Sequence, residues 1–299
     1  MGNIEEFRNK IILGNNIETL RKIPDDSIHL VITSPPYNIG NIDMSEKIHK
    51  RGMNKIRDWD DSLPSLGIMS KGYDGFEDNL PHSQYVDQQR ELIKECIRIL
   101  HPNGAIFYNH KIRIIDGIMR DHHDILNGFP VRQMIIWNRY SSMARTNRLF
   151  QQSYEVIYMI NKKPNTGLYL TEQGMNYSDI WAFCCERDNK HPAPYPVQLP
   201  YFAISGVDVK KTFDTDKMIV LDPYSGSGTT ALVAKELGHD YIGLELSEQY
   251  REMSLERLAK TDVRSELAEA GLLEGKDRDI HRQVKFFGID HNNVNKIQL

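Results

Sequence analysis

Two adjacent prolines after a short apolar run are the first residues of this chain whose order points to chemistry. Leu30-Val31-Ile32 indicates a strand, and Thr33-Ser34-Pro35-Pro36-Tyr37 follows it directly. Prolines lack an N–H donor and fix φ, so the strand must end in a rigid, extended turn. The turn presents the carbonyls of Ser34 and Pro35 and the ring of Tyr37 at the carboxyl end of a strand, where open α/β sheets bind ligands. Such acceptors suit a flat molecule with an amino group, although a plain proline turn would have the same sequence.

A glycine-rich loop lies in the last third of the chain. A buried-type strand over 218–221 runs into Asp222-Pro223-Tyr224-Ser225-Gly226-Ser227-Gly228-Thr229-Thr230, and a helix to about residue 237 follows. This order is typical of nucleotide-binding sites, because glycines let the backbone approach a ligand closely. Glu245 ends the next strand, seventeen residues after Gly228, where a carboxylate binds the ribose hydroxyls of an adenosine cofactor. The loop is not G-x-G-x-x-G, since Ala231 takes the third position, and it is not a Walker loop.

A proline-rich segment precedes the glycine loop. It begins with His191-Pro192 and holds four prolines between residues 192 and 200. Because proline disfavours helix interiors and central strands, we expect a rigid, extended segment there. On its own, the segment would be interpreted as a linker.

Composition excludes several classes of protein. The 299 residues are 40% hydrophobic and 26% charged, which is ordinary for a soluble globular protein of one large domain or two small ones. No apolar run approaches the length of a membrane helix, and the acidic amino terminus is unlike a secretory signal. Cys96, Cys184 and Cys185 make neither a metal-ligand spacing nor a disulfide framework. We therefore expect a cytoplasmic protein without a membrane anchor and without a metal.

Basic residues gather in two segments, although the formal net charge is −4. Segment 45–57 holds five Lys and Arg residues against Glu46. Segment 131–163 has Glu155 as its single acid against Arg132, Arg139, Arg145, Arg148, Lys162 and Lys163. Such clusters fit a nucleic-acid phosphate footprint, and they also fit ordinary solvated surface.

Hydrophobic periodicity predicts alternating strands and helices. Helices are expected over 17–23, 83–100, 112–126, 229–237 and 247–260. Strands are expected over 10–13, 29–33, 105–108, 133–137, 154–160, 218–221 and 241–244. The long segment 38–82 and segment 139–152 have no apolar period, 161–190 is irregular, and 261–299 forms a charged tail. The alternation predicts an α/β fold with a mainly parallel sheet.

Together these motifs resemble the amino-methyltransferases of DNA, which transfer a methyl group from S-adenosylmethionine to N4 of cytosine or N6 of adenine. Thr33–Tyr37 matches the family's catalytic motif (Asp/Asn/Ser)-Pro-Pro-(Tyr/Phe), and Asp222–Gly228 is similar to its Asp-Pro-Phe-x-Gly-x-Gly motif, with Tyr224 in place of Phe. His191-Pro192 resembles the family segment that binds the methionine part of the cofactor, and Trp137 matches a recurring strand. One departure is Asn15 after Gly14, where the family usually has Asp.

The resemblance implies which residues act. The catalytic residues would be Ser34, Pro35, Pro36 and Tyr37. Residues implied to contact DNA are Arg139, Arg145 and Arg148. S-adenosylmethionine would contact Asn15, Thr33, His191, Pro192, Asp222, Pro223, Tyr224, Ser225, Gly226, Gly228, Thr229 and Glu245.

The resemblance also implies an architecture. It predicts a three-layer, Rossmann-like methyltransferase fold, with the catalytic motif before the cofactor motif, which is the circular permutation called beta-type. The catalytic part would span 1–137 with its long loop 38–82, a target-recognition segment 138–190, the cofactor-binding part 191–260 and a tail 261–299. Double-stranded DNA is the expected partner, and family habit allows a homodimer and a cognate restriction endonuclease.

Ser34 favours cytosine N4 as the acceptor, because adenine enzymes of the family more often have Asp there; adenine N6 is the alternative. The target base would be flipped from the duplex to expose its amino group. Cytosine C5 chemistry needs a Pro-Cys nucleophile, which this chain lacks. Three rival interpretations remain: a catalytically inactive DNA-binding partner, a methyltransferase of RNA or protein, and an NAD-binding oxidoreductase, which would leave the double proline unexplained.

Overall fold

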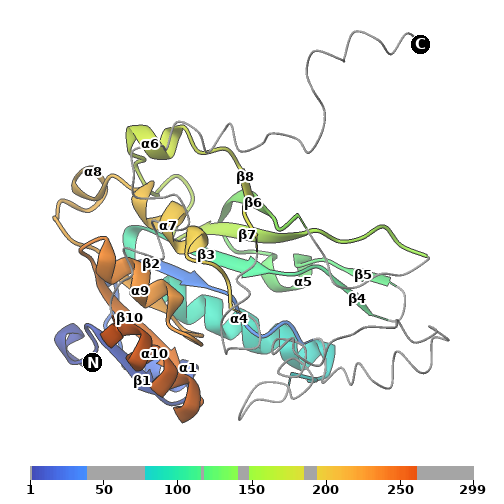
Figure 1. Ribbon diagram of the computed structural model, residues 1–299, viewed down its shortest axis with the longest axis horizontal. Coiled ribbons are helices and arrows are strands. Elements are labelled where there is room, and N and C mark those ends of the chain that lie inside the picture. Colours follow the sequence, from blue (N-terminus) through green and yellow to red (C-terminus); the bar gives the residue numbers. More distant parts are fainter. Residues whose placement is uncertain (1, 39–77, 116–117, 141–147, 185–193, 261–299) are drawn as a thin grey trace, which may run out of the picture. The chain divides into compact units, whose positions relative to one another are not determined.

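Short runs of β-branched residues form the strands at the centre of the fold (Figure 1). The computed structural model describes residues 2–38, 78–115, 118–140, 148–184 and 194–260. The strands are β1 (Lys10–Leu13), β2 (Ile28–Thr33), β3 (Leu100–His110), β4 (Arg113–Ile115), β5 (Ile118–Arg120), β6 (Val131–Asn138), β7 (Tyr154–Asn161), β8 (Ile180–Ala182), β9 (Ile219–Asp222) and β10 (Asp240–Glu245).

Eight of these described strands form one sheet, in the order β1-β10-β9-β2-β3-β7-β6-β8. Pairing is parallel from β1 to β3 and again between β6 and β8. Strand β7 runs antiparallel to both of its neighbours, β3 and β6. The predicted α/β fold with a mainly parallel sheet is confirmed.

Helices cover both faces of this sheet. They are η1 (Ile4–Glu6), α1 (Asn16–Leu20), α4 (His82–Ile99), α5 (His123–Leu126), α6 (Glu172–Met175), α7 (Gln198–Ser205), α8 (Val209–Phe213), α9 (Thr229–Glu236) and α10 (Glu248–Lys260). Helices α1 and α4 pack on one face, with α4 beneath β2 and β3 in Figure 1. Helices α7, α9 and α10 pack on the opposite face of the sheet, where they contact one another and the strands.

Alternating side chains of the central strands form a core on each face of the sheet. Ile219 and Leu221 of β9 belong to the core shared with α1 and α4. On the opposite face, the ring of Trp181 lies 6.4 Å from that of Phe107 and 5.3 Å from that of Phe202 in α7. This alternation follows from the two-residue period of a strand and produces helix, sheet and helix layers.

The predicted helix over 112–126 is wrong. Arg113–Ile115 and Ile118–Arg120 instead form the antiparallel strands β4 and β5, and only His123–Leu126 is helical. The isoleucines at 114, 115 and 118 satisfy a helical spacing, but their branched side chains favour strands. Asp116-Gly117 between them is a residue pair typical of two-residue hairpin connections, and this signal outweighs the apolar spacing.

Two smaller expectations also need correction. Pro200 lies inside α7, so the proline-rich segment does become helical from Gln198. Proline is tolerated there because the first turn of a helix has no intrahelical acceptors for its N–H groups. The range 161–190, expected to be irregular, contains α6 and β8. No helix among the described residues is long and apolar enough to cross a membrane.

Replacing Leu221 with Ala should destabilise the fold strongly. Leu221 is 0% exposed and directly precedes Asp222, and a core leucine-to-alanine change costs about 2–5 kcal/mol because it leaves a cavity. Leu255→Ala is the matched control, since Leu255 is 39% exposed and surface changes stay within about 0.5 kcal/mol. Denaturant-induced unfolding of both variants measures the difference; equal losses would contradict the assigned core.

Candidate active site

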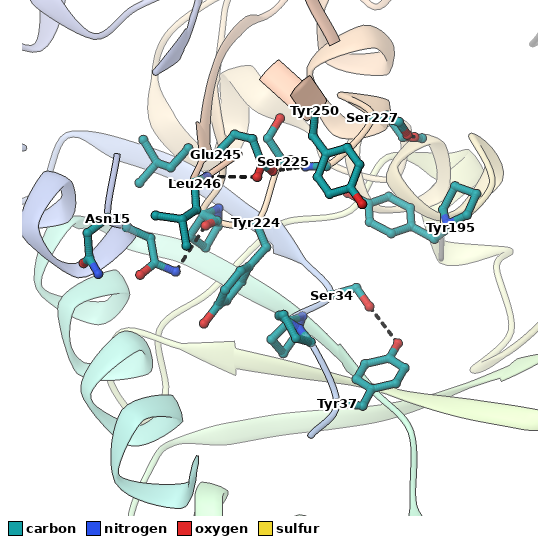
Figure 2. Close-up of a pocket in the computed structure, with 18 of the residues that line it drawn as sticks. Asn15, Ser34, Tyr37, Tyr195, Tyr224, Ser225, Ser227, Glu245, Leu246 and Tyr250 are labelled. Carbon is teal, nitrogen blue, oxygen red and sulfur yellow. Dashed lines mark hydrogen bonds between the residues drawn. The ribbon is translucent and has the colours of Figure 1, made fainter. Parts of the chain in front are cut away.

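The predicted catalytic and cofactor motifs line one pocket. Strand β9 lies between β2 and β10, all three pair in parallel, and their carboxyl ends therefore meet at one edge of the sheet. In Figure 2, Glu245 and Ser225 lie on one side of the pocket and Ser34 and Tyr37 on the other. The lining residues are Gly14, Asn15, Asn16, Ser34, Pro35, Pro36, Tyr37, Gln88, Pro194, Tyr195, Pro223, Tyr224, Ser225, Gly226, Ser227, Thr229, Leu244, Glu245, Leu246 and Tyr250.

The glycine loop depends on two residues with positive φ. Gly226 has φ 52° and Gly228 has φ 75°, a region that other residues rarely adopt. A Cβ on Gly228 would also lie 3.0 Å from Cβ of Ser254, and the Ser254 hydroxyl donates to the Gly226 carbonyl at 2.7 Å. The glycine loop therefore packs closely against α10. This contact positions the first residues of α9 beside the pocket.

Backbone amides orient the carboxylate of Glu245. Gly226 N donates to Oε2 at 2.8 Å, while Leu246 N and Ser247 N donate to Oε1 at 2.9 Å. Burial raises the pKa of the Glu245 carboxyl above its usual value, and these hydrogen bonds oppose that rise. Oε1 already accepts two hydrogen bonds and Oε2 accepts one, so the acceptor site that remains on Oε2 can bind a hydroxyl in the pocket.

The buried carboxylate of Asp222 stabilises the glycine loop. Asp222 is 1% exposed and does not line the pocket. Its carboxylate accepts hydrogen bonds from the Tyr195 hydroxyl at 2.6 Å, the Thr230 hydroxyl at 3.1 Å and Tyr224 N at 3.0 Å. Burial raises the pKa of the Asp222 carboxyl, and these donors oppose that rise. The structure thus places Asp222 as the residue that fixes the loop and the segment around Tyr195.

Asn15 lines the pocket and also caps a helix. Its Oδ1 accepts a hydrogen bond from Glu18 N at 3.1 Å, which is the N-cap of α1. The amide NH₂ is the part of Asn15 left to donate to a ligand. The neighbouring Asn16 donates from Nδ2 to the Pro223 carbonyl at 3.3 Å, which links this corner of the pocket to the glycine loop.

The catalytic motif is part of a compact polar network. The Tyr37 hydroxyl lies 2.7 Å from Ser34 Oγ and donates to Glu155 Oε2 at 2.8 Å (Figure 2 shows the first contact). Asn109 Nδ2 contacts Ser34 Oγ at 3.1 Å, the Tyr37 hydroxyl at 2.8 Å and Glu155 Oε2 at 2.8 Å. Arg139 Nη1 donates to the other oxygen of Glu155 at 2.9 Å. Phenol, hydroxyl and carboxylate are therefore held together at the base of the pocket.

A second group of side chains holds the double proline in place. The Tyr85 hydroxyl donates to the Pro36 carbonyl at 2.9 Å and lies 2.5 Å from Nε2 of His110. The His110 ring contacts the ring of Tyr37 with centroids 4.8 Å apart. Burial lowers the pKa of the His110 imidazole well below its usual value, so the ring is neutral. The turn is thus fixed through one carbonyl and one aromatic face.

The remaining predicted site residues lie in four kinds of place. Thr33 is 1% exposed and is not among the residues that line the pocket. His191, Pro192 and Arg145 lie outside the described residues. Arg139 lies beside Glu155 with a side chain 13% exposed, so the structure places it in the polar network. Arg148 is exposed and is not among the residues that line the pocket.

Several site residues were not predicted from the sequence. Asn109 and Glu155 join the catalytic network from β3 and β7, Tyr195 supports Asp222, and Tyr250 lines the pocket. Two signals were present in the sequence: Glu155 is the single acid of a basic segment, and Asn109 follows the predicted strand 105–108. A single acid among arginines at the start of a strand, as Glu155 is, indicates a buried carboxylate paired with an arginine.

The donor and acceptor set of the pocket fits an adenosine-containing cofactor. Glu245 supplies an acceptor for a ribose hydroxyl, and Tyr224, Leu246 and Tyr250 supply apolar surface for a flat ring. Oγ of Ser225 is buried and lies 2.6 Å from the place of a Cβ on Gly243, so this hydroxyl faces β10. The residues present therefore accommodate such a group.

Comparisons with known proteins agree with this geometry. The solved structure of the PvuII DNA methyltransferase (cytosine-N4-specific) has a TM-score of 0.61 and 18% identity, over 91% of this chain and 92% of that one. The complex of M1.HpyAVI with SAM has a TM-score of 0.51 and 19% identity, over 83% and 98%. The type II methyltransferase M.HpaI of Haemophilus parainfluenzae is 27% identical over 83% of this chain and 74% of its own length.

The family model of N6 and N4 methyltransferases, described as DNA methylase, matches residues 28–256. That range begins with β2, which carries the catalytic turn, and ends within α10, which packs on the glycine loop. Because the match covers most of the chain, the protein belongs to the N6/N4 family of DNA methylases and is a DNA amino-methyltransferase.

Proposed function

We propose that this chain is the site-specific modification methyltransferase of a type II restriction-modification system, and that it methylates N4 of a cytosine flipped out of duplex DNA. One observation carries the proposal: the acceptor array of Ser34, Pro35 and Tyr37 lines the same pocket as Glu245 and the glycine loop. A type II methyltransferase among the relatives supports the biological setting.

S-adenosylmethionine is the cofactor, and when bound it supplies an electrophilic methyl group. The chain's own residues bind and orient it. Glu245 accepts a hydrogen bond from a ribose hydroxyl, Asn15 donates to the adenine from its amide, and Ser225 lines the same pocket. Tyr224 and Leu246 provide the apolar walls. The His191-Pro192 segment is assigned to the methionine end by its resemblance to the family motif.

The catalytic turn binds the target base. Tyr37 stacks on the base with the ring face that is not packed on His110. The Ser34 side chain and the Pro35 carbonyl accept hydrogen bonds from the exocyclic amino group. These bonds favour a more tetrahedral nitrogen, whose lone pair then points away from the ring plane and can attack the methyl carbon. Base flipping is required because the amino group is otherwise paired inside the duplex.

Cytosine is favoured over adenine because of Ser34 in the catalytic motif. The PvuII enzyme, named cytosine-N4-specific, shares the fold and supports this choice. Adenine N6 is the alternative, since the acceptor array would bind either amino group.

Target recognition is assigned to connections that leave the sheet near the site. The proposed recognition range 138–190 includes β7 and β8, which are strands of the main sheet. We therefore place DNA contacts in the connections around those strands, with Arg145 and Arg148 as candidate phosphate or guanine ligands. The catalytic strand β2 precedes the cofactor strand β9 in the sequence, which supports the beta-type permutation.

Replacing Tyr37 with Ala should abolish most turnover while cofactor binding persists. The change removes both the stacking surface and the hydroxyl contacts, which lie opposite the Glu245 side of the pocket. Loss of one stacked base contact costs about 1–3 kcal/mol, or roughly 5- to 150-fold. Transfer of tritiated methyl groups to DNA and calorimetric titration with S-adenosylmethionine measure the two effects. Tyr169→Ala, at a half-exposed tyrosine, is the control, and full activity of Tyr37→Ala would contradict this site.

Replacing Glu245 with Gln should weaken cofactor binding about 10- to 100-fold, because charge-assisted hydrogen bonds to the ribose become neutral ones. Burial raises the pKa of Glu245, and binding needs its ionised form. Affinity of the natural protein should therefore fall as the pH falls through this raised pKa, at a higher pH than an ordinary glutamate would give.

Calorimetry across the acidic range measures this dependence. Glu245→Gln should remove it, whereas Glu252→Gln on the exposed surface of α10 should leave both affinity and pH dependence unchanged. A pH dependence that persists in Glu245→Gln would assign it to another group.

The methylated base should be N4-methylcytosine. DNA treated with the enzyme is digested to nucleosides, and the modified nucleoside is identified by mass spectrometry. N6-methyladenine in the digest would replace the cytosine assignment with the adenine alternative. Absence of any methylated nucleoside would favour the inactive DNA-binding partner.

A further inference from the structure

We propose that Ser34, Tyr37 and Glu155 form a proton relay that removes the proton released by amino methylation. The inference rests on the proposed function and adds the destination of the proton. Ser34 would accept the proton from the base, Tyr37 would pass it on, and Glu155 would hold it. The three groups are connected by contacts of 2.7 Å and 2.8 Å.

The direction of the relay follows from the chemistry of a carboxylate. A carboxylate only accepts hydrogen bonds, so the contact between Tyr37 and Glu155 Oε2 uses the phenol proton. The phenol has no second proton, and its contact with Ser34 therefore uses the serine proton. Both hydroxyls thus point toward Glu155. Ser34 Oγ then has only lone pairs to offer in other directions.

Asn109 confirms this arrangement of donors and acceptors. Its Nδ2 lies 2.8 Å from Glu155 Oε2, and only a donor is favourable beside a carboxylate. The second N–H of this amide is shared between the Tyr37 hydroxyl at 2.8 Å and Ser34 Oγ at 3.1 Å, so it takes at most one serine lone pair. The second lone pair of Ser34 is available to the amino N–H of the base, and Ser34 lines the pocket in which that base would lie.

Burial explains why the proton needs a relay. Asn109 is 0% exposed and Glu155 is 5% exposed, so this end of the network is screened from bulk water, whereas Ser34 and Tyr37 are half-buried and line the pocket. Among the residues that the structure describes, the charged groups of the network are Glu155 and Arg139, whose guanidinium compensates the carboxylate charge. The other titratable neighbour, His110, packs on the Tyr37 ring as a neutral imidazole. Glu155 is therefore the group of the network that accepts the proton.

The proton balance of the step is complete. The amino nitrogen lone pair forms the new N–C bond while the bond from that carbon to sulfur breaks and its electrons stay on sulfur. The nitrogen then has four bonds and a positive charge, and it gives up a proton readily. That proton binds Ser34 Oγ, the serine proton moves to Tyr37, and the phenol proton moves to Glu155. The product base is neutral, both hydroxyls are restored and Glu155 is protonated until the product leaves.

The relay is tested with Glu155→Gln, Tyr37→Phe and the double variant in single-turnover methylation of DNA. Gln keeps the size of Glu but cannot hold the proton, and Phe keeps the stacking ring but lacks the hydroxyl. Each single variant should lose about 10²-fold in rate, the lower end of general acid–base effects. The double variant should be no slower than either single one, because each change breaks the same relay.

A rescue experiment separates proton transfer from packing. Glu155→Ala should recover activity with added formate, which restores a carboxylate, and should not recover with formamide, which has the same shape without the charge. Affinities for S-adenosylmethionine and DNA should change little in Glu155→Gln, whereas the thermal midpoint should fall because Arg139 loses its buried carboxylate partner. Glu252→Gln, at an exposed glutamate of α10, is the matched control and should keep the natural rate.

Three results would overturn the relay: a natural rate in Glu155→Gln or Tyr37→Phe, equal rescue by formate and formamide, or additive losses in the double variant. If Glu155→Gln fails to fold, Tyr37→Phe alone decides, because its ring and packing are retained. The relay and the proposed function fail differently. A natural protein that transfers no methyl group to DNA contradicts the function, whereas an active protein with unaffected variants contradicts only the relay.

Discussion

The parallel pairing of β2 with β9 is the constraint on which the site depends. The register places Val31 opposite Leu221, so the catalytic turn and the glycine loop leave the sheet side by side. These segments are almost two hundred residues apart in the sequence. Parallel strands bring their carboxyl ends to the same edge, and this arrangement puts the catalytic turn beside the cofactor loop.

Local contacts then fix the conformations of the glycine loop and the catalytic turn. The glycine loop is held by the buried Asp222 and by contact with α10, and the double proline is held by Tyr85 and His110. Both loops lose little further freedom when ligands bind, because their conformations are already fixed. Preorganised groups of this kind stabilise charge without reorganisation at the moment of reaction.

The sequence predicted the parts of the site that local chemistry determines. Prolines end a strand, positive-φ glycines form a tight loop and an acid ends the next strand, so Ser34–Tyr37, the glycine loop and Glu245 were found from neighbours in the sequence. The α/β class followed from periodicity in the same way. Asn109 and Glu155 were missed because each acts through a partner at least 46 residues away. The antiparallel pair β4–β5 was missed because its isoleucines fit both a helical and a strand period.

The buried pair of Glu155 and Arg139 shows why such groups are difficult to predict. A buried ion pair gains little stability, because desolvation of both charges offsets their attraction. An apolar pair would serve the same place in the sheet at no greater cost. Yet this carboxylate receives donors from the catalytic turn, β3 and the residue after β6, and the donor from the turn, Tyr37, lines the pocket. A charge that packing does not need, and that is hydrogen-bonded to a residue of the catalytic turn, is better explained by chemistry than by folding.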